Sequence, residues 1–104
     1  MTTYHILWTP VYGPDVSPFE LLIFGDGARH SLVQADDVDA ARELHEERTE
    51  LGGSTVGEYQ LVEELTPAIA QEALDNGVTS VLVGIEGGEP IFDDSIVPAV
   101  AAQQ

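Results

Sequence analysis

The feature that most constrains the fold is an uncharged, β-branched run at residues 78–85, with the sequence VTSVLVGI. Asn76-Gly77 precedes the run and Glu86-Gly87-Gly88-Glu89 follows it, so turn-forming residues bound it at both ends. An uncharged run of this length is typical of a strand that is buried on both faces. The run therefore predicts a central strand with helices packed against it. It indicates a core and no particular chemistry.

Several other segments carry strand patterns. Alternating or continuous apolar side chains predict further strands at residues 4–9, 19–24, 29–33, 56–65 and 90–92. The turn signal Gly25-Asp26-Gly27 would join two of these strands in a hairpin. In the strand at residues 56–65, the alternation places Tyr59, Leu61 and Leu65 on one face. The acidic and amide side chains on the other face are typical of an outer strand.

Two segments carry helix signals. Asp36 is a suitable N-cap for a helix over residues 37–51, and Gly52-Gly53 follows its end. Thr66-Pro67 provides an N-cap and a first helical residue for a second helix, which Asn76-Gly77 ends.

The resulting order is β-β-(β)-α-β-α-β-(β). It predicts a small two-layer α+β sandwich, in which a mixed sheet of four to six strands carries two helices on one face. The segment from residue 56 to residue 85 would be a crossover between parallel strands. A chain of 104 residues has room for one domain. We expect a single acidic domain over residues 1–104, with residues 93–104 as a C-terminal extension.

The charge balance is strongly acidic. Nineteen Asp and Glu residues stand against three basic residues, and the formal net charge is −16. The three basic residues are Arg29, Arg42 and Arg48, with no lysine. The acids are spread along the chain, which favours adaptation to concentrated salt, because salt screens the repulsion within a highly charged protein. The shortage of basic residues argues against direct binding to nucleic acid or to an anionic membrane.

The sequence also bears on location and cofactors. It has no cysteine, which excludes disulfides and cysteine-ligated metals. We expect a cytoplasmic or virion protein, because residues 1–5 lack the pattern of a signal peptide and no apolar run is long enough for a transmembrane segment.

Residues that could support catalysis or metal binding do not form a recognised motif. His5, His30 and His45 lack the spacing of metal-binding histidines, and the sequence favours His30 as a surface or hairpin residue. None of the serines lies in a G-x-S-x-G elbow. We therefore expect no catalytic, cofactor-binding or metal-ligating residues and no cofactor. Asp26 and His30 with the nearby glycine turns remain an alternative, as a small-ligand site.

Apolar side chains in a proline-rich loop and in the C-terminal segment are candidates for partner contact. They are Val11, Tyr12, Val16, Ile96, Val97 and Val100. The leading hypothesis is a non-enzymatic structural or protein–protein interaction subunit of a salt-adapted cell or virus. It would act in a larger assembly, with a protein partner or as a homo-oligomer. The alternative is an acidic mimic of nucleic acid that inhibits a DNA-binding protein, with the helical acids Glu43, Glu46, Glu47 and Glu50 in place of phosphates.

Overall fold

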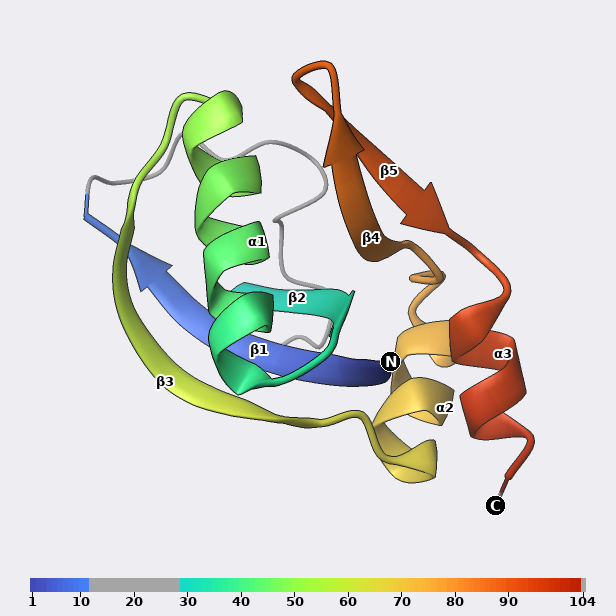
Figure 1. Ribbon diagram of the computed structural model, residues 1–104. Coiled ribbons are helices and arrows are strands. Elements are labelled where there is room, and N and C mark those ends of the chain that lie inside the picture. Colours follow the sequence, from blue (N-terminus) through green and yellow to red (C-terminus); the bar gives the residue numbers. More distant parts are fainter. Residues whose placement is uncertain (12–28, 104) are drawn as a thin grey trace.

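The computed structural model describes residues 1–11 and 29–103, and in this part of the chain it is a mixed five-stranded sheet with three helices (Figure 1). The strands are β1 (Thr2–Pro10), β2 (Arg29–Ala35), β3 (Val56–Glu64), β4 (Val81–Glu86) and β5 (Glu89–Asp93). The helices are α1 (Val38–Leu51), α2 (Pro67–Asp75) and α3 (Ile96–Ala101). The predicted α+β fold with a mixed sheet is confirmed. The predicted strand at residues 19–24 and the turn at residues 25–27 lie outside the described residues.

The strand order in the sheet is β3-β1-β2-β4-β5. β1 is antiparallel to both of its neighbours, β2 is parallel to β4, and β4 forms a hairpin with β5. It follows that β3 and β4 run in the same direction, with β1 and β2 between them and α2 in the connection. The expected crossover between parallel strands is therefore present.

The uncharged run at residues 78–85 forms β4, which begins at Val81 and lies inside the sheet but not at its middle. Val81 and Leu82 are buried, whereas the rest of the strand is half-buried or exposed. The prediction of burial along the whole run was therefore wrong. The reason is visible in Figure 1, where the β4–β5 hairpin extends away from α2 and α3.

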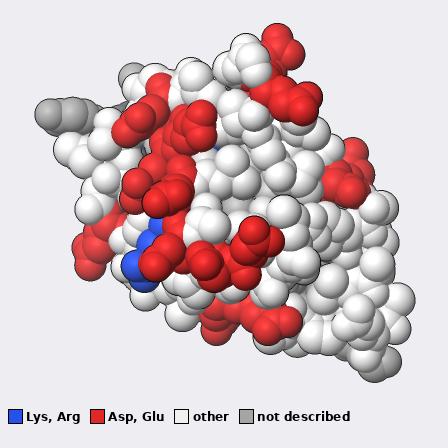
Figure 2. Space-filling model, in the orientation of Figure 1, with Lys and Arg blue, Asp and Glu red and all other residues white. Residues whose placement is uncertain are grey.

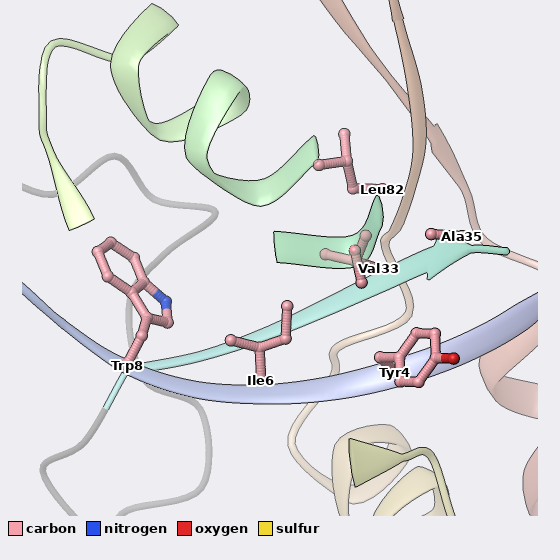
Figure 3. Close-up of a cluster of buried hydrophobic side chains, with 7 residues drawn as sticks. Tyr4, Ile6, Trp8, Val33, Ala35 and Leu82 are labelled. Atoms are coloured by element: carbon pink, nitrogen blue, oxygen red, sulfur yellow. The ribbon is translucent and has the colours of Figure 1, made fainter. Parts of the chain in front are cut away.

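Two clusters of apolar side chains form the core. The first comprises Tyr4, Ile6, Trp8, Val33, Ala35, Ala41 and Leu82, and Figure 3 shows its members from β1 on one side of that strand. The second comprises Leu32, Leu65, Ala70, Ala73, Val81, Val97 and Ala101. Adjacent residues of a strand point to opposite faces, so Leu32 and Val33 place the two clusters on opposite faces of the sheet.

The helices divide between these faces. α1 contributes Ala41 to the first cluster, and α2 and α3 contribute to the second and pack against each other (Figure 1). Two helices thus share one face, but they are α2 and α3, and α1 covers the other face. Within the described residues, no helix is long and apolar enough to cross a membrane.

The helix ends follow the sequence signals closely. The carboxylate of Asp37 caps α1 by accepting a hydrogen bond from the Ala40 amide at 2.8 Å, so the N-cap lies one residue later than predicted. The hydroxyl of Thr66 accepts from the Ile69 amide at 3.2 Å and caps α2. Both side chains satisfy amides that a helix N-terminus leaves unpaired.

A β-bulge in β3 changes the predicted pattern of faces. Trp8 pairs with Tyr59 and Leu7 pairs with Leu61, so Gln60 is an extra residue between the two pairs. Tyr59 consequently packs against the first cluster, whereas Leu61 lies on the opposite face and is 38% exposed. The prediction that Tyr59 and Leu61 share a face was wrong, because strict alternation fails across a bulge.

Replacing Ile6 tests this assignment of the core. Ile6→Ala removes a fully buried side chain and should lower the free energy of unfolding by about 2 to 5 kcal/mol, measured by chemical denaturation. Leu61→Ala, on the adjacent strand, should lower it by about 1 kcal/mol or less because Leu61 is partly exposed. Equal losses for the two variants would contradict the bulge and the faces derived from it.

Candidate functional site

A polar hydrogen-bonded chain lies between α1 and the sheet. Trp8 Nε1 donates to Ser31 Oγ at 3.0 Å, and Ser31 Oγ is 3.0 Å from His45 Nε2. The other ring nitrogen of His45, Nδ1, is 3.1 Å from the Tyr59 hydroxyl, which donates to the Arg42 carbonyl at 3.2 Å. The chain thus connects β1, β2, α1 and β3, and it returns to α1 through Arg42.

The direction of this chain fixes the tautomer of His45. The Tyr59 hydroxyl has one proton and gives it to the Arg42 carbonyl, so it accepts from His45 Nδ1–H. His45 Nε2 then carries no proton and accepts from the Ser31 hydroxyl, which in turn accepts from the Trp8 indole. In this arrangement every donor and acceptor in the chain has a partner.

Burial keeps the His45 ring neutral. Removal from water, and secondarily the positive charge of Arg48, lower the pKa of His45 to about 4. The pKa of Tyr59 is raised well above its usual value, chiefly by burial and then by the nearby Glu46 carboxylate. Both groups are therefore uncharged at neutral pH, which suits their place beside an apolar cluster.

Ser31 and His45 have the spacing of a nucleophile and its base, and the tautomer of His45 is the one that a general base needs. Three features favour a structural role instead. Trp8 is fully buried and His45 is 2% exposed. The Ser31 hydroxyl already has two partners. A base with a pKa of about 4 accepts protons poorly at neutral pH.

A second histidine contact lies on the opposite face of the sheet. His5 Nε2 and His30 Nδ1 are 2.7 Å apart, and the two rings are nearly parallel, with centroids 5.0 Å apart and planes 10° apart. His5 Nδ1 is 3.7 Å from a carboxylate oxygen of Glu63 on β3. The pKa of His5 is lowered, first by burial and then by His30, while Glu63 acts in the opposite direction.

Sequence reasoning missed both histidine arrangements. His30 was expected as a surface or hairpin residue, and it lies on β2, buried beside His5. The signal lay in the pairing of β1 with β2, because Leu7 pairs with His30 and His5 pairs with Leu32. That register makes His5 and His30 diagonal neighbours on one face, within reach of each other. The contact between His5 and His30 could be predicted from sequence only if the register of β1 against β2 were already known.

The sequence-predicted partner residues have different surroundings. Val11 is exposed, Ile96 and Val100 are half-buried, and Val97 is fully buried inside the second cluster. Tyr12, Val16 and Asp26 lie outside the described residues. Among residues 1–11 and 29–103, no group of three or more His, Cys, Asp or Glu residues could hold a metal ion.

Charge is unevenly distributed over the molecule. Ten of the nineteen acids lie between residues 36 and 64: Asp36, Asp37, Asp39, Glu43, Glu46, Glu47, Glu50, Glu58, Glu63 and Glu64. Figure 2 shows acidic side chains crowded over α1 and β3, and a largely uncharged area where α2 and α3 lie. Two of the arginines lie over aromatic rings, Arg29 at 5.7 Å from the Trp8 centroid and Arg42 at 5.6 Å from the Tyr59 centroid.

Comparison with protein-family models, with curated proteins and with solved structures finds no match to this chain.

Removing the Tyr59 hydroxyl tests the hydrogen-bonded chain. Tyr59→Phe leaves the buried His45 Nδ1–H without its acceptor and should lower the free energy of unfolding by about 1 to 3 kcal/mol. Tyr4→Phe is the matched control, because Tyr4 belongs to the same cluster that Tyr59 packs against, but its hydroxyl is outside the chain. It should change the free energy by about 0.5 kcal/mol or less. If Tyr4→Phe lowered the free energy of unfolding as much as Tyr59→Phe does, the hydrogen-bonded chain would not be the source of the stability.

Acid should weaken the fold through His45. The pKa of His45 is about 4 in the folded protein and about 6.5 when unfolded, so between these values the unfolded state binds more protons. Above about pH 6.5, His45 is neutral in both states and its full contribution to the free energy of unfolding is present. As the pH drops toward about 4, protonation of the unfolded state lowers that free energy by up to about 3 kcal/mol. His45→Gln removes this titration. Chemical denaturation across this pH range should show a smaller loss of unfolding free energy in the variant than in the wild type. Equal losses in the two proteins would show that His45 is not the source of the acid sensitivity.

Proposed function

We propose that the protein is a non-enzymatic structural or protein–protein interaction subunit of a salt-adapted cell or virus, and that it acts in the cytoplasm or in a virion. The observation that carries the proposal is the contrast between a crowded acidic surface over α1 and β3 and an uncharged surface at α3. A protein with a net charge of −16 repels other copies and acidic partners, so contact is easiest where charge is absent.

Salt adaptation is supported by the spacing of acids on α1. Glu43 lies four residues from Asp39 and from Glu47, so like charges face each other along the helix surface. These pairs destabilise a helix in dilute buffer and are screened in concentrated salt. The basic residues offer little compensation, since only three are present.

The contact surface we propose is the outer side of α3. Residues 95–104 contain no charged side chain. Pro98, Ala99 and Ala102 are exposed there, and Ile96 and Val100 are half-buried beside them. Val97 is excluded from this surface, because it packs in the core. The partner is a second copy of the chain or another subunit of the assembly.

Molecular mass measured by light scattering after size exclusion, from dilute buffer to molar salt, tests this proposal. The wild type should exceed its monomer mass of 11.2 kDa in molar salt and lose structure in dilute buffer. Ala99→Glu places a charge on the proposed surface and should return the protein to a monomer. Gln60→Glu adds the same charge on β3 and should not. A well-folded monomer at every salt concentration would overturn the proposal.

The concentration of ten acids between residues 36 and 64 also supports the second candidate, an acidic mimic of nucleic acid. Such a mimic would occupy the basic cleft of a DNA-binding protein with α1 and β3. Salt separates the two candidates, because attraction between opposite charges is screened in molar salt, whereas contact through α3 is strengthened. A partner captured in dilute buffer and released by salt would favour the mimic.

A further inference from the structure

His5 and His30 contact each other through one nitrogen of each ring, and this contact limits the number of protons that the two rings can bind together. Both side chains are buried, with exposed fractions of 4% and 6%. A distance of 2.7 Å between His5 Nε2 and His30 Nδ1 corresponds to a hydrogen bond, which needs a proton on one nitrogen and a lone pair on the other. The hydrogen bond therefore requires one proton between the two facing nitrogens, bound to one of them and accepted by the other.

The state of the pair depends on how many protons it binds. When both rings are neutral, one ring donates to the other across the contact. When one ring is protonated, the bond becomes charge-assisted and stays intact. When both are protonated, each ring carries a hydrogen on both nitrogens, so two N–H groups and two positive charges meet at 2.7 Å. The third state cannot keep the observed geometry.

The groups around His5 act on its charge in opposite directions. From β2, His30 faces His5 directly, and from β3 the Glu63 carboxylate lies 3.7 Å from His5 Nδ1. From α2, the Glu72 carboxylate also acts on His5 by its charge. Burial, and then the His30 ring, oppose a positive charge on His5, whereas the two carboxylates favour it and offset part of that cost. The pKa of His5 is lowered as a net result.

We propose that His5 and His30 form a shared-proton pair that acts as an acid-sensitive latch between β1 and β2, closed with zero or one added proton and opened by the second. The pair lies on the face of the sheet opposite His45, so the latch is independent of the hydrogen-bonded chain under α1. Opening separates the two rings and loosens the face of the sheet that carries Glu63 and the second cluster.

Two substitutions keep the hydrogen bond but remove the shared titration. The Asn amide in His30→Asn takes the place of His30 Nδ1, and the Gln amide in His5→Gln takes the place of His5 Nε2. His45→Gln serves as the control, because it removes a buried histidine outside the pair. If one variant of the pair fails to fold, the other and the wild type suffice.

Nitrogen-15 NMR of the histidine rings, followed from about pH 7 to about pH 4, measures the latch. In the wild type, the His5 ring signals should change in two steps, because His5 shares a proton with His30. In His30→Asn, His5 should titrate in one step at a higher pH, and His45→Gln should leave the two steps unchanged. If His5 titrates in one step at the same pH in the wild type and in His30→Asn, the rings are not coupled and the latch is refuted.

Thermal unfolding over the same pH range supplies the second readout. The melting temperature of the wild type should fall more steeply with acid than that of His30→Asn or His5→Gln, because only the wild type forms the doubly protonated pair. Parallel curves for the wild type and both variants would show that the second proton does not open the structure, and this would overturn the proposal.

Discussion

The structure under α1 depends on one polar atom, the indole nitrogen of Trp8. Trp8 is among the largest fully buried side chains, and its N–H needs an acceptor away from water. Ser31 supplies that acceptor, and its own proton then needs His45, whose second nitrogen needs Tyr59. Burying one large aromatic ring therefore determines residue types on β2, α1 and β3. The chain ends on α1, where the Arg42 carbonyl accepts from the Tyr59 hydroxyl and the Glu46 carboxylate lies beside it.

Local features of the fold could be predicted from sequence, and long-range ones could not. The N-cap at Thr66 and the hairpin turn at Gly87-Gly88, where both residues have positive φ, depend on neighbouring residues alone. The bulge at Gln60 and the contact of His5 with His30 depend on the register between strands, which no local pattern specifies. The candidate sites were missed for this reason, since their residues come from separate strands and helices.

The acidic side chains and the uncharged C-terminal segment lie in different parts of this molecule. The acids gather over α1 and β3, while residues 95–104 contain none and α3 contributes Val97 to the core. This short helix covers the second cluster with its buried face, while its exposed face carries no charge. The C-terminal segment therefore has a structural role in this chain, independent of any partner.

Acid acts on the two kinds of titratable group in opposite directions. Protonation of exposed carboxylates reduces the repulsion of a molecule with a net charge of −16, and this favours the folded state except at carboxylates that accept hydrogen bonds, such as Asp37 and Asp93. Protonation of His45 or of His5 places charge where water is excluded and destabilises the folded state. Salt weakens the first effect far more than the second, because it screens exposed charges and leaves buried ones largely unscreened. In concentrated salt, the buried histidines therefore account for a larger share of the response of this fold to pH.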